Sequence, residues 1–388
     1  MKNLKIAAII AEYNPFHNGH LYHIRKAKEI FDYIIIIMSG NFVQRGEPAI
    51  INKFARTKMA LLGGADVVIE LNSVAATHSA EGFAKGAINL IDSCNIAQFI
   101  CYGAEDDNLK DHQEIAKILA FENDAYKFLL RQELSKGLSY PKARYNALKE
   151  ICPKIADIIN SPNNILSVEY LKAILSQNSN LEPVLIKRQG GEHNSQNIGV
   201  DYASATAIRN HMNSNQPITD LEPFMPSYSL NILQKSSKNT LDNYSQIFQY
   251  ILKTKGLLAF DGISIEEGLK IRIINAAAKE YKISNIINLA KTKRYTYSSI
   301  KRAIMQVLLE INKNDAINPH FIRILGFRKQ SQILLKLLKQ HSKLPIVINL
   351  QNAPEEIKPE LEKELKISSL YHINEPAYNE YFQKIVIK

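Results

Sequence analysis

The chain opens with a strand-like run that leads directly into a helical pattern: residues 5–23 read KIAAIIAEYNPFHNGHLYH. The apolar run 5–10 predicts a strand buried on both faces, and the helical pattern 19–30 begins within His17-Asn18-Gly19-His20. A helix start offers unpaired backbone N–H groups and the positive end of the helix dipole, both of which favour phosphate. The stretch therefore predicts an α/β fold with an anion site at its first strand–helix junction.

Further apolar runs alternate with helical patterns through the first half. We predict strands at 33–38, 66–71, 98–102 and 183–187, and a helix at 53–62 that stops at Gly63-Gly64. Such alternation implies right-handed crossovers and a parallel sheet. Residues 189–201, rich in glycine and polar side chains, are predicted to form a mobile loop.

The length of 388 residues exceeds the roughly 250–300 at which a single core stops growing, so we predict two domains. Pro217, Pro223 and Pro226 interrupt the pattern between them. We expect a first domain at 1–215 that contains the anion site and a basic, mainly helical domain at 216–388, with a small α/β element near 344–350 and the last residues.

The basic residues are concentrated in the second half. The formal net charge is +10, and residues 217–388 hold 25 Lys and Arg against 16 Asp and Glu. Such an excess attracts polyanions, which favours nucleic-acid binding over the alternative of a merely solvated basic surface.

Other classes of protein are disfavoured. No apolar stretch approaches the roughly 20 residues needed to cross a bilayer, and no signal peptide is recognisable, so we expect a cytoplasmic protein without a membrane partner. Cys94, Cys101 and Cys152 are widely spaced and predict reduced, buried thiols rather than a metal site. The sequence predicts no particular oligomeric state.

His17 and His20 are the predicted catalytic residues. Three positions apart, they share one side of the first helical turn, where both can donate hydrogen bonds to phosphate oxygens. Gly19 permits close approach of a triphosphate, with which Mg²⁺ is expected. Donors of this kind stabilise charge during adenylyl transfer. The alternative is a metal pair or two solvated histidines.

A second anion site is predicted at Ser204-Ala205-Thr206-Ala207-Ile208-Arg209. Ser204 is a plausible N-cap, and the hydroxyls of Ser204 and Thr206, the helix start and the Arg209 guanidinium can together bind phosphate.

These two motifs resemble those of the HxGH nucleotidyltransferase superfamily, which implies a Rossmann-like domain and triphosphate contacts from Ser204, Thr206 and Arg209. The chain resembles the bacterial tRNA(Met) cytidine acetate ligases more closely, through EYNPFHNGHLYH (12–23), MSGNFVQRGEPA (38–49), ARTKMAL (55–61), GADVVIELN (64–72), SPNNIL (161–166), SATAIR (204–209) and KRYT (293–296). The likeness covers most of 1–212 and several later segments.

By this resemblance, the ATP-binding segment comprises Ile10, Ala11, Glu12, Tyr13, Asn14, Pro15, Phe16, His17, Asn18, Gly19, His20, Leu21, Tyr22 and His23. Further ATP contacts are implied at Gly103, Asn163 and Arg188. From the residues alone Gly103 can be an ordinary turn glycine, Asn164 can replace Asn163, and Lys187 can replace Arg188, because strand residues alternate faces. Ser167 stands where the family pattern carries Gly.

The resemblance also identifies 40–48 as a loop over the active site. There Gln44 and Arg45 are candidates to position acetate or cytidine, and Lys53, Arg56 and Lys58 are candidates to reach phosphates or RNA. The alternative is a solvated loop followed by a basic helix.

In the second half, cations alternate with aromatic residues, which suits phosphate contacts and base stacking. The candidate tRNA-binding residues are Lys293, Arg294, Tyr295, Lys301 and Arg302. The alternative is an amphipathic helix with a solvated face.

The resemblance implies an ATP-dependent ligase that activates acetate as acetyl-adenylate and acetylates the N4 amine of the wobble cytidine of elongator tRNA(Met). Two other functions stay open from the residues: a small-molecule adenylyltransferase, and an ATP-sensing RNA-binding protein without catalysis. The large basic second half argues against the former, and the number of phosphate donors against the latter.

Overall fold

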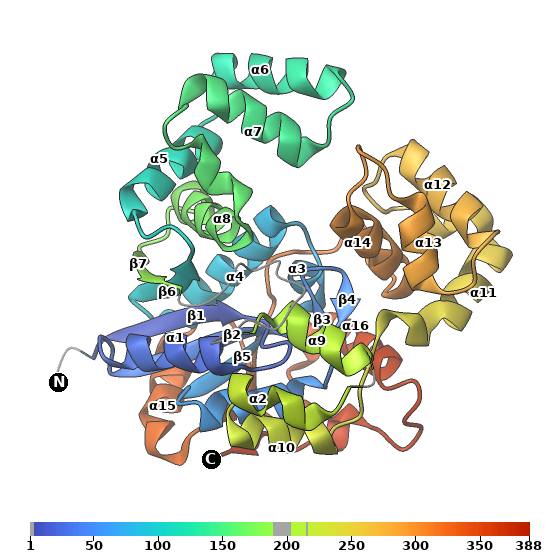
Figure 1. Cartoon of the computed structure of the whole chain (residues 1–388). Coiled ribbons are helices and arrows are strands. Elements are labelled where there is room, and N and C mark those ends of the chain that lie inside the picture. The colour runs from blue at the N-terminus through green and yellow to red at the C-terminus, as the bar shows by residue number, and fades with distance from the viewer. Residues whose placement is uncertain (1–3, 189–202, 215) are drawn as a thin grey trace.

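The computed structural model describes residues 4–188, 203–214 and 216–388; the loop expected at 189–201 lies outside them. One sheet runs through the molecule in the order β10-β8-β5-β2-β1-β6-β7, with β9 paired to β8 (Figure 1). All these neighbours are parallel except β5 and β8. The mainly parallel α/β fold predicted from the sequence is confirmed.

The strands are β1 (Ile6–Ala11), β2 (Tyr33–Ser39), β5 (Val67–Leu71), β6 (Phe99–Ala104), β7 (Glu182–Lys187), β8 (Ile322–Phe327), β9 (Ile346–Val347) and β10 (Val386–Ile387). A short hairpin, β3 (Phe42–Val43) and β4 (Glu47–Pro48), follows β2. The five strands predicted in the first half are present, each within one or two residues of the predicted bounds.

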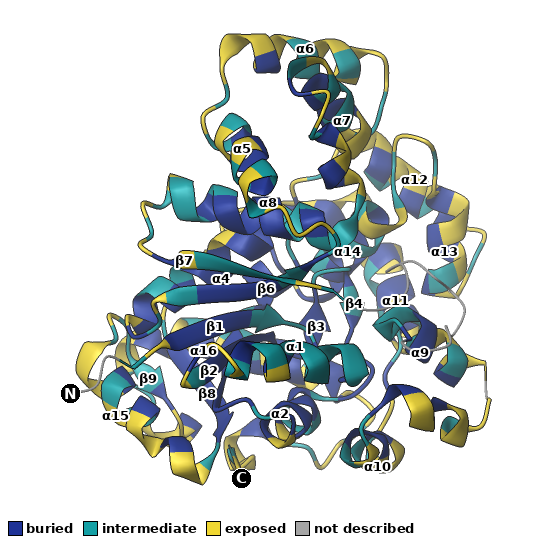
Figure 2. Cartoon of the chain, turned by 60° about the vertical axis from the view of Figure 1, so that its left-hand side comes forward, coloured by how far each residue is buried: buried dark blue, intermediate teal, exposed yellow. Residues whose placement is uncertain are grey.

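Both faces of the sheet are buried, which explains why its strands are continuously apolar. Ala8 and Ile35 face the core beneath α4 (Ala80–Cys94), whereas Ile9 and Ile36 face the core of α1 (Asn18–Lys28), α2 (Lys53–Leu62) and α10 (Ser227–Lys235). Figure 2 shows the buried strands between these helical layers.

Two helical groups flank the sheet (Figure 1). One has its own core and comprises α5 (Leu109–Ala120), α6 (Asp124–Ser135), α7 (Tyr140–Ile151) and α8 (Pro162–Ser176). The other comprises α11 (Ser245–Lys255), α12 (Glu267–Ala277), α13 (Ile283–Ala290) and α14 (Tyr297–Leu308). The remaining helices are α3 (Ser73–Ala76), α9 (Ala205–Asn213), α15 (Gln332–His341) and α16 (Lys358–Tyr371).

The second half of the chain contributes directly to the sheet. β8 pairs with β5, and β10 and β9 pair with β8, so the small α/β element expected near the C-terminus extends the main sheet. α10 likewise packs on α2. The boundary at 215/216 stays a prediction.

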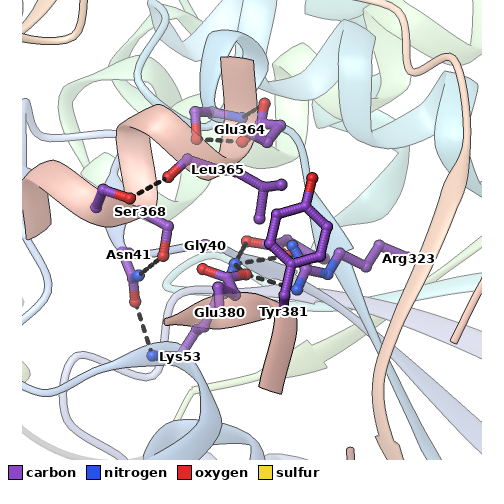
Figure 3. A network of polar contacts seen from close by, with 12 residues as sticks. Gly40, Asn41, Lys53, Arg323, Glu364, Leu365, Ser368, Glu380 and Tyr381 are labelled. Atoms are coloured by element: carbon purple, nitrogen blue, oxygen red, sulfur yellow. Dashed lines mark hydrogen bonds and ion pairs between the residues drawn. The ribbon is translucent and has the colours of Figure 1, made fainter. Parts of the chain in front are cut away.

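Two basic residues of α2 are buried, and the expectation that they reach phosphates or RNA is wrong. Lys53 is 2% exposed and pairs with Glu70 (2.7 Å) and with Glu380 (2.6 Å). Arg323 contacts both of these glutamates as well (Figure 3). This network joins α2 to β5, β8 and the C-terminal segment.

Arg56 is fully buried and donates to backbone carbonyls at three places. Its Nη1 bonds Glu12 O (2.6 Å) and Ser39 O (3.0 Å), its Nη2 bonds Gly40 O, and its Nε bonds Ile51 O (3.1 Å). Burial lowers the pKa of Arg56 to about 10, which leaves it charged at neutral pH. Arg56 therefore joins the carboxyl ends of β1 and β2 to the start of α2.

Arg56→Met should lower the free energy of unfolding by about 3–5 kcal/mol, because it leaves buried carbonyls without donors. Urea denaturation measures the change. Lys58→Met is the matched control, since Lys58 is exposed on the same helix and should cost less than about 0.5 kcal/mol. Similar small changes in both variants would contradict the bridging role of Arg56.

Candidate functional site

The two histidines of the motif form the N-terminal cap of α1. His17 Nδ1 accepts from Gly19 N (3.1 Å), His20 Nδ1 accepts from His17 N (3.3 Å), and the rings stack with centroids 3.7 Å apart. Because each Nδ1 is an acceptor, a neutral ring carries its proton on Nε2. Both rings can therefore donate from Nε2, as binding of phosphate requires.

Gly19 is required by this cap. A Cβ there would lie 2.9 Å from His17 Cε1, so any side chain would displace the ring. Within the cap, the Gly19 N–H donates to His17 Nδ1 and the N–H groups of His20 and Leu21 donate to His17 O. The first turn therefore offers an anion mainly the positive end of the helix dipole.

The loop between β1 and α1 is held in an uncommon conformation. Tyr13 has a φ of 49°, and its ring contacts Phe16 and His20, with centroids 4.9 Å away in each case. Asn14 Oδ1 accepts from Ile50 N (2.8 Å). A left-handed tyrosine persists because surrounding contacts determine its position.

The second motif meets the first at this loop. Ser204 caps α9 by accepting from Ala207 N (3.0 Å), as predicted. Arg209 Nη1 donates to Asn14 O (2.8 Å), and its Nη2 lies 3.4 Å from Thr206 Oγ1. Residues almost 200 positions apart thus form one cationic corner beside the histidine motif.

Arg188 lies over Gly103 at the ends of β7 and β6. A Cβ on Gly103 would come within 3.1 Å of Arg188 Cγ. Lys187 instead is exposed and pairs with Asp107 (3.1 Å). Of the two alternatives, Arg188 is the one directed toward the motif helix.

His23, on α1, lies close to Arg188. Its Nε2 lies 3.6 Å from Cys101 Sγ, and burial, with Arg188 nearby, lowers the pKa of His23 to about 4. His23 is therefore neutral at pH 7.

All three cysteines are free and buried, as predicted.

The two asparagines at the start of α8 have different environments. Asn164, 3% exposed, accepts from the N–H groups of Glu105 (2.9 Å) and Asp106 (3.2 Å) and so anchors the loop after β6. Asn163 is partly exposed and donates to Glu105 Oε1 (2.5 Å). The side-chain oxygen of Asn164 already accepts two backbone hydrogen bonds, which favours Asn163 as the residue that can contact a nucleotide.

Ser167, the departure from the family pattern, is fully buried. Its hydroxyl lies 2.7 Å from His112 Nδ1. The added side chain therefore finds a polar partner between α5 and α8.

The β3–β4 hairpin closes over the end of β1. Gln44 N donates to Glu12 Oε1 (2.8 Å), and burial raises the pKa of Glu12. Glu47 pairs with Arg209 (2.9 Å) and with Lys301 of α14 (2.8 Å). Sequence reasoning assigned Glu47 no role, because neither partner is near it in the chain.

The candidate tRNA-binding residues fall into two places. Arg294 and Tyr295 contact Glu266 at 2.6 and 3.0 Å, and Lys293 is exposed beside them. Lys301 and Arg302, by contrast, lie against the hairpin, where a Cβ on Gly46 would be 2.5 Å from Arg302 N.

Within the described residues, no group of three or more His, Cys, Asp or Glu side chains is arranged to hold a metal ion. No helix in the described ranges is long and apolar enough to span a membrane.

Comparison with known proteins identifies relatives over the whole chain. Residues 4–384 match the family model described as HIGH Nucleotidyl Transferase. The tRNA(Met) cytidine acetate ligase of Thermosipho melanesiensis is 42% identical over 362 residues, covering 89% of this chain and 84% of that protein. The protein of the same name from Thermoanaerobacter sp. (strain X514) is 39% identical over 382 residues, covering 94% of each.

Solved structures agree. Apo TmcAL of Thermotoga maritima is 32% identical, covers 99% of both chains and superposes with a TM-score of 0.92. The same protein bound with alpha-thio ATP gives a TM-score of 0.88. The chain therefore belongs to the HIGH nucleotidyl transferases and, among them, to the tRNA(Met) cytidine acetate ligase family.

Proposed function

We propose that this protein uses ATP to activate acetate and then acetylates the wobble cytidine of elongator tRNA(Met), forming N4-acetylcytidine. The observation that carries the proposal is the convergence of the capped histidine pair and Arg209 on one loop, in a chain whose relatives over most of its length are named tRNA(Met) cytidine acetate ligase. A tRNA substrate supports a cytoplasmic location for the enzyme.

In the first step, an acetate oxygen attacks the α-phosphorus of ATP, and the bond to pyrophosphate breaks. His17 and His20 donate from Nε2, while the first turn of α1 and Arg209 face the charge that develops on the phosphates. Ser204 and Thr206 border the same corner on α9. Mg²⁺ would be held chiefly by triphosphate oxygens and water and would neutralise charge there.

We assign adenosine to the carboxyl ends of β6 and β7. Gly103 allows close approach at the carboxyl ends of the strands, where open α/β sheets bind ligands. Arg188, which directly follows β7, and Asn163 on α8 border that position, and neutral His23 lies close to Arg188. The remaining residues of 10–23 form the strand end, loop and helix start that support these contacts.

In the second step, the N4 amine of cytidine attacks the acetyl carbonyl carbon, the bond to AMP breaks, and N4 loses a proton. Because this amine is a poor nucleophile, positioning dominates the step. Gln44 and Arg45 lie on the hairpin over the end of β1 and are the candidates to position acetate or cytidine.

One assay separates the proposal from a small-molecule adenylyltransferase and from an ATP-sensing RNA-binding protein. The protein is incubated with ATP, labelled acetate and bulk tRNA, and the digested RNA is examined for N4-acetylcytidine. Acetate-independent transfer of AMP, or ATP binding without a labelled nucleoside, would rule out the ligase.

His20→Ala should reduce acetate-dependent exchange of pyrophosphate into ATP by about 100-fold or more, because it removes a phosphate donor and one acceptor of the α1 cap. Lys26→Ala is the control on the exposed face of α1 and should retain exchange. Retained exchange in His20→Ala would contradict the assigned role.

Lys293→Ala combined with Arg294→Ala should leave acetate-dependent exchange within about twofold of wild type and weaken tRNA acetylation, since both side chains are exposed away from the α1 motif. The difference from wild type should shrink as the salt concentration rises, because the variant makes fewer phosphate contacts for salt to weaken. Parallel loss of exchange and acetylation would argue against a separate tRNA-binding role.

A further inference from the structure

The carboxylate of Glu47 is shared by two cations from different parts of the fold. Its Oε1 lies 2.9 Å from Arg209 Nη2 on α9, and its Oε2 lies 2.8 Å from Lys301 Nζ on α14. All three side chains are largely buried, with exposed fractions of 14%, 14% and 29% for Glu47, Arg209 and Lys301. Glu47 therefore connects Lys301 to Arg209, a residue that is predicted to bind the triphosphate.

The backbone holds Lys301 in this place. Gly46, at the hairpin tip with a φ of 72°, packs on the backbone of Lys301 and Arg302, so closely that a Cβ would lie 2.7 Å from Lys301 C. Figure 1 shows β4 beside α14. The middle of α14, at Lys301 and Arg302, thus packs against the hairpin and is not a freely exposed basic surface.

The charges explain why two cations are needed. Asn14 O and Thr206 Oγ1 accept from the Arg209 guanidinium, and Glu47 adds an ion pair to it. A pair of Arg209 and Glu47 alone would be neutral and would attract phosphate weakly. Lys301 restores a net charge of +1 to these three side chains, and Arg45 adds a further positive charge that acts on Glu47. Although burial opposes ionisation, Arg209 and Lys301 hold the pKa of Glu47 below its usual value, so the carboxylate stays charged.

We propose that Lys301 is a positioning residue for acetate activation, which acts through Glu47 to hold Arg209 at the triphosphate. The proposal rests on the proposed function and departs from the sequence-based assignment of Lys301 to tRNA binding. It predicts an effect on the first step even when no RNA is present.

The test is acetate-dependent exchange of pyrophosphate into ATP, measured without tRNA. Lys301→Gln should raise the KM for ATP about five- to tenfold, the equivalent of a partly buried ion pair, with a smaller change in kcat. Lys301→Arg should restore most of the affinity, because its guanidinium can also reach Glu47. Lys253→Gln, at an exposed site on α11, is the control for loss of one positive charge.

A double-mutant cycle distinguishes action through Glu47 from a direct contact. In a Glu47→Gln background, Lys301→Gln should change the KM for ATP by less than about twofold. An equal effect of Lys301→Gln with and without Glu47 would overturn the proposal, as would a variant that loses only tRNA acetylation. Thermal unfolding of each variant excludes loss of folded protein as the cause.

Failure of the inference and failure of the proposed function give different results. If the wild-type protein shows no acetate-dependent exchange, the proposed function fails. If the wild type exchanges and Lys301→Gln matches it, the positioning role alone is wrong.

Discussion

The buried guanidinium of Arg56 is the constraint on which the site depends. It collects carbonyls from the ends of β1 and β2 and from the turn before α2, which would otherwise be buried without donors. Because one of these carbonyls belongs to Glu12, the guanidinium fixes the residue that begins the motif loop. The first residue of the loop is thereby held in place, and the same loop leads to the cap of α1 and carries the Asn14 carbonyl that Arg209 contacts.

A second set of buried charges joins the two halves of the chain. Lys53 and Arg323 share Glu70 and Glu380, so α2, β5, β8 and the C-terminal segment are connected by one network. Removing one member would leave its partners charged in a buried place, which costs more than the pair contributes. The later strands are therefore part of the scaffold that supports the proposed nucleotide site, although the separate helical group of α11–α14 lies between β7 and β8 in the chain.

The sequence predicts features that depend on neighbouring residues. The strands, the start of α1 and the cap at Ser204 follow from periodicity and capping chemistry, and all are present. Lys53, Arg56 and Lys58 look alike in the sequence, yet only Lys58 is exposed, because the partners of Lys53 and Arg56 come from other strands and the chain terminus. The role of Glu47 could not be predicted for the same reason, because its partners lie 162 and 254 residues away in the chain.

The hairpin that carries Glu47 lies between the residues proposed for acetate activation and the basic helical group proposed for tRNA binding. On one side it meets Glu12 and Arg209 beside the helix that is assigned to the phosphates, and on the other it meets α14 of the basic helical group. Acetyl-adenylate hydrolyses readily in water, so an enzyme that makes it gains if RNA is bound next to the activated carbonyl. A hairpin fitted between the two regions places them in contact without a flexible linker. The basic half is therefore in direct contact with the proposed activation site, through Lys301 of α14, which pairs with Glu47 beside Arg209.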